Sequence, residues 1–242
     1  MTVKATGADK RDRTQMTENT QNSAISQVVN GKSFVDIGAL WGTASEKASV
    51  AWTHGASEVS VVDILPLNDP LWTAFDEHLA TLGSPPAAHI SKNLDDVTDA
   101  DPKWDVVHTS GVIYHCPSPM HTLGQLKRIT GEHLIITSMV IPPSISSPTG
   151  TLTLRPGQSW FVPTLDAEAR QIAGEYLNST GVVGAWGIDV AVGPWDATDY
   201  GPWWWLFTPQ SFRELVETAG FEVVMEGSSW EGRSHTVLAR PV

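Results

Sequence analysis

Short apolar runs alternate with longer segments of helical spacing along the first part of the chain. Short apolar runs with β-branched residues, typical of buried strands, occupy positions 33–37, 59–63, 104–110 and 133–138, and residues 89–94 form a weaker strand pattern. Apolar residues recur at every third or fourth position, which predicts helices, over positions 44–54, 70–82 and 119–129. Because strands and helices alternate, we predict an α/β fold with a doubly wound, mostly parallel sheet.

The last part of the chain predicts one more helix and two strands. Thr208 can cap this helix, and Pro209 suits its first turn because that position needs no backbone N–H donor. Gly220 follows the last helical position, and residues 221–225 and 236–239 are expected to form a closing pair of strands.

One long segment lacks a regular pattern. Residues 141–202 are irregular and rich in proline, glycine, serine and tryptophan. A loop of this length inside a compact domain is usually a functional lid or a binding element. We therefore predict a single domain over residues 31–242 that carries this segment as a lid insert. A flexible tail and a short helix are expected over residues 1–30.

Composition narrows the class of protein. Hydrophobic residues make up 41% of the 242 residues and charged residues 17%, which predicts a packed globular core. No apolar stretch is long enough to span a membrane, and the N-terminal residues lack the apolar core of a signal peptide. The one cysteine, Cys116, cannot form an internal disulfide or a cysteine-based zinc site. We expect a cytoplasmic protein with no membrane partner.

The charge of the chain disfavours nucleic acid as a partner. The formal net charge is −12, and basic residues cluster only near the N-terminus. Proteins that bind nucleic acids need clustered lysines and arginines, because neutralised phosphates supply most of the affinity. A small molecule or a glycan is the better candidate.

A glycine-containing turn follows the first predicted strand. Gly38 and Gly42 allow a tight turn and let a ligand approach the backbone closely. A dinucleotide would bring its pyrophosphate towards the Asp36 carboxylate, whereas a cationic sulfonium cofactor tolerates an acidic neighbour. No Gly-Lys-Ser/Thr sequence follows, so the turn is not a phosphate-binding loop. Asp63, at the end of the second strand, is placed to bind a ribose hydroxyl pair.

This segment resembles the first motif of class I S-adenosylmethionine-dependent methyltransferases, which runs acidic-x-Gly-x-Gly-x-Gly. Asp36, Gly38 and Gly42 match it, and Leu40 replaces the middle glycine. The resemblance implies a Rossmann-like seven-stranded fold with an antiparallel last strand, and S-adenosylmethionine as the cofactor. The cofactor-binding residues that it implies are Asp36, Gly38, Ala39, Gly42, Asp63, Ile64, Asn93, Leu94, Ser110 and Tyr114.

Two further segments resemble a narrower branch of these enzymes. Residues 111–119 look like its Gly-Val-Leu-Tyr-His signature, and residues 205–221 also look like that branch. The branch includes the wobble-uridine tRNA carboxymethyltransferases. Those enzymes carry a long N-terminal extension for a carboxylated cofactor and a basic RNA-binding face, whereas this chain is acidic. Ordinary S-adenosylmethionine is therefore the expected cofactor.

Candidate catalytic residues follow the fourth predicted strand, at the edge where open α/β sheets bind ligands. The resemblance implies that Tyr114 contacts the amino-acid end of the cofactor and that His115 faces the acceptor. His115 is the candidate general base because imidazole titrates near neutral pH. A lid aspartate is the reserve, and a buried His–Tyr pair is the structural alternative. Cys116 is interpreted as a packing residue, while Arg233 and His235 lie either near the active-site mouth or in a solvated hairpin.

Five of the eleven tryptophans lie between Trp186 and Trp205, at the end of the lid and directly after it. Indole faces stack on sugars and on other flat ligands, and nearby carboxylates accept hydrogen bonds from hydroxyl groups. The candidate acceptor-binding residues are Trp186, Asp189, Trp195, Asp199, Trp203 and Trp205. The alternative is that the lid packs a small core of its own or forms a homodimer interface. Its carboxylates could also hold Mg²⁺, although no spacing singles out a metal site.

These features predict a methyltransferase that uses S-adenosylmethionine to O-methylate a hydroxyl group of a sugar, a glycan or another polar small molecule. Two alternatives remain. One is a tRNA-modifying methyltransferase of the wobble-uridine type, and the other is a non-catalytic S-adenosylmethionine-binding protein.

Overall fold

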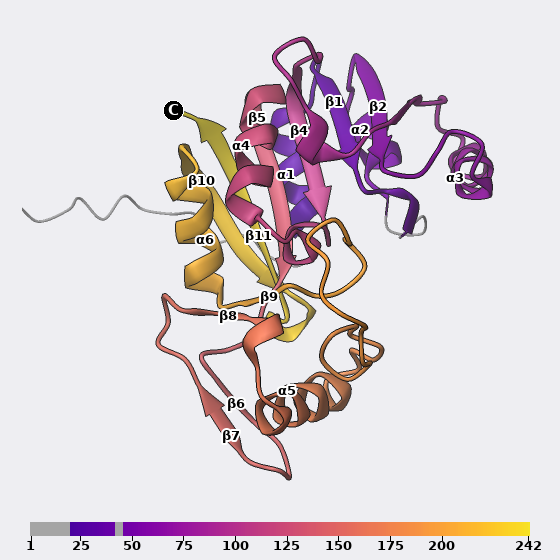
Figure 1. Cartoon of the computed structure of the whole chain (residues 1–242). Coiled ribbons are helices and arrows are strands. Elements are labelled where there is room, and N and C mark those ends of the chain that lie inside the picture. Colours follow the sequence, from indigo (N-terminus) through magenta and orange to yellow (C-terminus); the bar gives the residue numbers. More distant parts are fainter. Residues whose placement is uncertain (1–19, 42–45) are drawn as a thin grey trace, which may run out of the picture.

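The computed structural model describes residues 20–41 and 46–242 of the chain. A seven-stranded sheet lies at its centre, with the strand order β10-β11-β5-β4-β1-β2-β3 (Figure 1). Its strands are β1 (Ser33–Ile37), β2 (Glu58–Asp63), β3 (Ala88–Ser91), β4 (Trp104–Ser110), β5 (Thr130–Met139), β10 (Phe221–Ser229) and β11 (Ser234–Pro241). Neighbouring strands pair in parallel, except that β11 runs antiparallel to β5 and β10. The predicted mostly parallel sheet with an antiparallel last strand is confirmed.

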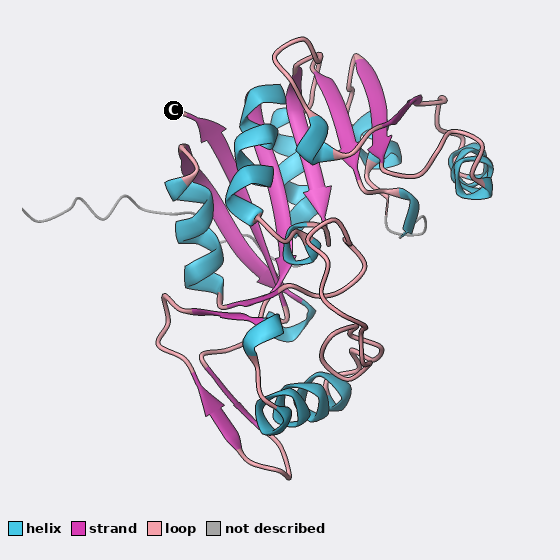
Figure 2. Ribbon diagram, in the orientation of Figure 1, coloured by secondary structure: helices cyan, strands magenta, loops and turns pink. Residues whose placement is uncertain are grey.

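Helices cover both faces of this sheet (Figure 2). They are α1 (Thr20–Val28), α2 (Ala48–Thr53), α3 (Pro70–Thr81), α4 (Pro119–Ile129) and α6 (Pro209–Thr218), with α5 (Ala167–Ser179) set apart in the lid. Apolar residues of α1, α2 and α3 share one buried cluster on one face. Those of α4 and α6 belong to a second cluster on the other face. The predicted tail lies outside the described residues, as do the first positions of the helix expected over 44–54.

Successive side chains of β1 point alternately to the two faces of the sheet, so neighbouring residues belong to different clusters. Phe34 packs into the first cluster, whereas Val35 and Ile37 pack into the second. Successive side chains of a strand point to opposite faces, so Asp36 shares the face that α1 and α2 cover. The strand thereby places a buried carboxylate beneath the turn that follows it.

The lid segment contains regular elements, which corrects the prediction that it is irregular. It holds α5 and the short strands β6 (Ser144–Ser146), β7 (Thr151–Thr153) and β8 (Ser159–Phe161), and β8 pairs with β9 (Trp205–Phe207). Asp166 caps α5 by accepting a hydrogen bond from the backbone N–H of Ala169 at 2.8 Å. Ile172 and Leu177 are buried on its inner side. The strands are only three residues long, so their two-residue period does not stand out in the sequence.

The third strand ends earlier than predicted. β3 stops at Ser91, and the Asn93 side chain then accepts a hydrogen bond from the backbone N–H of Asp95 at 3.0 Å. This bond starts the short helical turn η2 (Leu94–Asp96). The closing strands, in contrast, extend beyond the predicted ends and meet at the turn η5 (Trp230–Gly232).

Candidate active site

A cavity of about 1530 Å³ lies at the carboxyl ends of β1, β2 and β4. Gly38 follows β1, Asp63 ends β2 and Ser110 ends β4, and all three line it. Parts of α1, the lid and the turn η5 complete its wall. The cavity therefore lies at the sheet edge where the sequence predicted ligand binding.

The turn after β1 requires glycine at its first position. Gly38 has a φ of +78°, and a Cβ atom there would lie 2.6 Å from Cγ2 of Val112. Ala39 lines the cavity, whereas Leu40 is only 1% exposed and packs into the cluster beneath α2 and α3. The leucine that replaces the middle glycine of the motif thus serves the core. Gly42 lies outside the described residues.

Asp63 presents an unsatisfied carboxylate oxygen. Its Oδ1 accepts a hydrogen bond from the backbone N–H of Leu65 at 3.1 Å, while its Oδ2 is buried without a partner. Burial raises the pKa of Asp63. A buried acceptor without a donor is costly, so this oxygen suits a ligand that donates hydroxyl protons. The 2′- and 3′-hydroxyls of a ribose fit that requirement. Ile64, which follows it, also lines the cavity.

Two further predicted cofactor-binding residues line the cavity beside the lid. Asn93 and the buried Leu94 both face it. Asp95 accepts a hydrogen bond from Thr122 Oγ1 at 2.8 Å and another from the hydroxyl group of Tyr200. Tyr200 belongs to the lid, so this second bond ties the lid to the cofactor side of the cavity. Nothing in the local sequence around Tyr200 indicates this contact.

Asp36 is held by a buried histidine. Its Oδ1 lies 2.7 Å from Nδ1 of His108 on the neighbouring strand, and its Oδ2 accepts a hydrogen bond from the backbone N–H of Lys47 at 2.7 Å. The side chains of Asp36 and His108 are both almost fully buried. On the same side of the cavity, Gln21 of α1 donates a hydrogen bond to Ser110 Oγ at 3.1 Å. Gln21, which sequence reasoning missed, makes α1 part of the cavity wall.

His115 is held in one tautomer by the lid. Its Nδ1 lies 3.0 Å from the carbonyl oxygen of Pro202, which can only accept a hydrogen bond. Nδ1 therefore carries the proton, and Nε2 of the neutral ring keeps its lone pair. Burial lowers the pKa of His115, against the opposing effect of the backbone carbonyls of Pro202 and Gly201. The side chain lines the cavity as a neutral base.

Tyr114 forms an aromatic layer with its neighbours. Its ring centroid lies 4.4 Å from that of His115 and 4.5 Å from that of Trp203. Burial raises the pKa of Tyr114 to about 12, so the phenol stays protonated at neutral pH. Tyr114 and His115 pack against each other, as expected of a buried structural pair. Both also line the cavity, as expected of residues that contact the cofactor and the acceptor.

The predicted acceptor-binding residues divide into two groups. Trp186, Asp199 and Trp203 line the cavity. Asp189 is exposed elsewhere on the lid and accepts a hydrogen bond from the backbone N–H of Gly184 at 3.0 Å.

The other lid tryptophans pack away from the cavity. Trp195 lies against Trp204, with ring centroids 4.9 Å apart, and under the guanidinium group of Arg170. Trp205 lines a separate hollow of about 290 Å³ and donates a hydrogen bond to the carbonyl oxygen of Pro117 at 3.4 Å. The side chains of Trp195 and Trp205 both pack against the buried cluster that also contains the apolar residues of α4 and α6, so the lid shares this core instead of forming one of its own.

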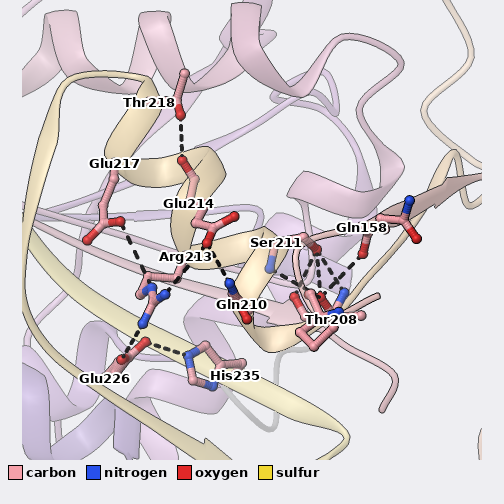
Figure 3. A network of polar contacts seen from close by, with 11 residues as sticks. Gln158, Thr208, Gln210, Ser211, Arg213, Glu214, Glu217, Thr218, Glu226 and His235 are labelled. Carbon is pink, nitrogen blue, oxygen red and sulfur yellow. Dashed lines mark hydrogen bonds and ion pairs between the residues drawn. The ribbon is translucent and has the colours of Figure 1, made fainter. Parts of the chain in front are cut away.

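The remaining candidates have structural surroundings. His235 is 6% exposed and lies 3.1 Å from the Glu226 carboxylate (Figure 3). Its Nδ1 lies 3.0 Å from the Ser228 hydroxyl group. It is therefore neither at the cavity nor in a solvated hairpin. Cys116 is buried, and burial raises its pKa to about 12, as expected of a packing residue rather than a nucleophile.

Within the part of the chain that the structure describes, no three His, Cys, Asp or Glu side chains are grouped to hold a metal ion. The expectation that lid carboxylates could hold Mg²⁺ thus has no described site to support it. None of the described helices combines the length and the apolar character that crossing a membrane requires.

Comparisons with solved structures identify the fold. An S-adenosylmethionine-dependent methyltransferase from Aquifex aeolicus aligns over 92% of this chain and 90% of its own, with a TM-score of 0.53 and 12% identity. A mitomycin 7-O-methyltransferase aligns over 92% of this chain and 53% of its own, with a TM-score of 0.54 and 14% identity. Magnesium protoporphyrin IX methyltransferase from Synechocystis was solved with bound S-adenosylhomocysteine. It aligns over 88% of this chain and 75% of its own, with a TM-score of 0.50 and 15% identity. The fold is the Rossmann-like methyltransferase fold.

The sequence itself identifies the family. The family model described as a methyltransferase domain matches residues 10–226. The chain belongs to this family of S-adenosylmethionine-dependent methyltransferases. No curated protein sequence matches the chain. The unpartnered Oδ2 of Asp63 and the glycine turn at Gly38 fit the adenosyl cofactor of that family.

Proposed function

We propose that this protein O-methylates a hydroxyl group of a sugar or of another polar small molecule, with His115 as the general base. The observation that carries the proposal is the hydrogen bond between Nδ1 of His115 and the carbonyl oxygen of Pro202. It leaves Nε2 as the basic atom of a neutral ring that lines the cavity. Asp63 and Gly38, which suit the cofactor, line the same cavity.

The chemistry demands little beyond alignment and proton removal. Bound S-adenosylmethionine supplies a methyl group that its positive sulfur already activates. The protein holds the acceptor oxygen in line with that group, and Nε2 of His115 takes the hydroxyl proton. The Pro202 carbonyl then stabilises the imidazolium, because Nδ1–H keeps its acceptor. Tyr114 stays protonated, which makes its phenol a donor to the acceptor oxygen or to the cofactor.

A donor-consumption assay tests this proposal. The full-length protein is given S-adenosylmethionine with sugars, phenols or tRNA, with and without Mg²⁺, and formation of S-adenosylhomocysteine is measured. We expect turnover with a neutral hydroxyl compound. His115→Asn should lower kcat by about 10²- to 10⁴-fold, the usual contribution of a general base. His54→Asn is the matched control, because His54 is exposed and lies outside the cavity. Unchanged turnover in His115→Asn would show that His115 is not the general base.

The similarity of residues 111–119 to the wobble-uridine branch makes tRNA the alternative acceptor. Binding of tRNA that weakens steeply with salt, together with turnover on tRNA, would replace the small-molecule proposal. The net charge of −12 argues for the opposite result. S-adenosylhomocysteine binding without turnover on any acceptor would favour a non-catalytic binding protein.

A further inference from the structure

The exposed tryptophans of this protein gather at one place. Among the described residues, the tryptophans that are mostly exposed are Trp41 at 76%, Trp186 at 54% and Trp230 at 65%. All three line the large cavity, and they come from separate segments: the turn after β1, the lid and the turn η5. Indole rings are large apolar surfaces that usually become buried. Their restriction to the cavity indicates a ligand with flat faces.

Trp230 is held in an unusual backbone conformation. Trp230 and Glu231 have φ values of 51° and 54°, and they are the non-glycine residues with positive φ among those described. Bulky L-residues rarely adopt this conformation, which persists only where the surrounding structure enforces it. Such outliers concentrate at ligand-binding positions. The turn η5 is therefore a candidate ligand-binding element of the cavity wall.

Arg233 fixes this turn. Its Nε donates a hydrogen bond to the carbonyl oxygen of Trp230 at 2.8 Å, and its backbone N–H donates to the same oxygen at 3.1 Å. Its own carbonyl oxygen accepts a hydrogen bond from the backbone N–H of Val140 at 2.8 Å. A Cβ atom on Gly181 of the lid would lie 3.8 Å from the Arg233 guanidinium, so the guanidinium group lies close to the lid. Arg233 thus fixes the turn beside the lid as a positioning residue.

A polar network joins α6 to β10 and β11, the strands that carry the turn η5 (Figure 3). His235 of β11 bonds to Ser228 and Glu226 of β10, and Arg213 of α6 lies 3.5 Å from the Glu226 carboxylate. Ser228 also lines the cavity. The network therefore lies directly behind the cavity wall, where it can hold Trp230 in place.

The charges around the cavity select against an anionic acceptor. Among the described lining residues, Lys47 and Lys92 are the lysines, and no arginine lines it. Lys92 is paired with Asp101, and Lys47 lies beside the carboxylates of Asp36 and Glu46. Asp199 and Glu231 add negative charge to the wall. A phosphorylated or carboxylated acceptor would meet repulsion there.

We propose that η5 is a specificity-determining wall of the acceptor site, in which Trp230 stacks on a ring of an uncharged, hydroxylated acceptor. Trp186 of the lid and Trp203, directly after it, supply further ring faces, and Arg233 keeps the turn in place. This inference rests on the proposed function, because it assigns the substrate class of the same site.

Binding measurements on the full-length protein saturated with S-adenosylhomocysteine test the inference. The probes are phenyl β-D-glucoside, methyl β-D-glucoside and phenyl phosphate, titrated by calorimetry. We expect phenyl β-D-glucoside to bind and phenyl phosphate to bind at least tenfold more weakly. Methyl β-D-glucoside distinguishes a sugar ring from an aromatic ring as the stacked group. Trp230→Asn removes the indole while tolerating positive φ, so it should weaken the glucoside by about tenfold. Trp230→Phe should restore most of that affinity.

Val224→Asn is the matched control, because Val224 is an exposed apolar residue of β10 outside the cavity. It should leave probe binding unchanged. Unchanged glucoside binding in Trp230→Asn, tighter binding of phenyl phosphate, or failure of both glucosides to bind would each overturn the inference. The donor-consumption assay separates these outcomes from a failure of the proposed function. Absence of turnover on every hydroxyl compound would reject that function, whereas the titrations test only which ring Trp230 contacts.

Discussion

The buried carboxylates of the cavity differ in their partners, and the difference assigns their roles. Both oxygens of Asp36 are hydrogen bonded, to His108 and to the backbone of Lys47. Asp63 has one oxygen bonded to the backbone of Leu65 and one oxygen without any partner. Asp36 therefore organises the turn after β1, whereas Asp63 is prepared for a ligand. At the scale of single residues, Oδ2 of Asp63 is the observation that best supports cofactor binding in this cavity.

The first prediction concerns this oxygen. Asp63→Ala should weaken S-adenosylhomocysteine binding by about 10- to 100-fold, because hydrogen bonds from ribose to a charged acceptor contribute about 1.5–3 kcal/mol. Isothermal titration calorimetry measures the change. Asp99→Ala serves as the control, since Asp99 is 87% exposed on its side chain and lies outside the cavity. Equal affinity of Asp63→Ala and the control would refute the ribose contact.

The second prediction concerns the pH dependence of turnover. Burial lowers the pKa of His115, so the ring loses its proton at a lower pH than a free imidazole. The neutral ring is the base. Activity should therefore be lost as the pH falls, with the acidic limb below the ordinary histidine pKa of about 6.5. A profile of kcat against pH measures it, and a limb that persists in His115→Asn would assign the titration to another group.

At the scale of elements, the lid is built around α5 and the segment that follows it. The backbone N–H of Trp204 donates a hydrogen bond to the carbonyl oxygen of Tyr114, and that of Trp203 donates to Trp186. The Tyr200 hydroxyl group donates a hydrogen bond to Asp95, and the carbonyl oxygen of Pro202 accepts one from His115. The same stretch of lid thus contacts the cofactor side and the catalytic side of the cavity, while α5 supports it from outside.

The third prediction concerns the cap of α5. Asp166→Ala removes the acceptor of the Ala169 N–H and should destabilise the protein by about 1 kcal/mol. Urea unfolding followed by circular dichroism measures the loss. Neither residue lines the cavity, so S-adenosylhomocysteine affinity should be unchanged. A large loss of affinity with unchanged stability would show that α5 acts on the site instead of supporting the lid.

At the scale of the whole molecule, one cavity joins the sheet, the first helix, the lid and the turn η5. A ligand there contacts elements that are distant in the sequence and belong to both buried clusters. Its binding free energy therefore adds to the stability of the entire fold, since it binds the folded chain alone.

The fourth prediction follows from this linkage. S-adenosylhomocysteine at 100 times its dissociation constant should stabilise the protein by about 2.7 kcal/mol. In a domain of this size, that corresponds to a rise in Tm of about 5–10 °C. Differential scanning calorimetry measures it. ATP, whose phosphates would meet the acidic turn, should produce no rise, and an equal rise with ATP would contradict a site built for a sulfonium cofactor.

Local sequence patterns determined most of the fold and the cofactor turn. Strand runs, the cap at Thr208 and the glycine at Gly38 act over a few residues, so each can be interpreted without knowing its neighbours in space. The third strand and the lid were misjudged, because a side-chain turn at Asn93 and three-residue strands leave weak patterns.

Only the tertiary structure decided which side chains meet at the site. Gln21, Tyr200 and Trp230 line the cavity from segments far apart in the chain, and Trp205 turns away although its neighbour Trp203 does not. The tautomer of His115 depends on a lid carbonyl 87 residues away. Contacts of this kind depend on packing between segments that are distant in the sequence, and hydrophobic periodicity along the chain does not predict such packing.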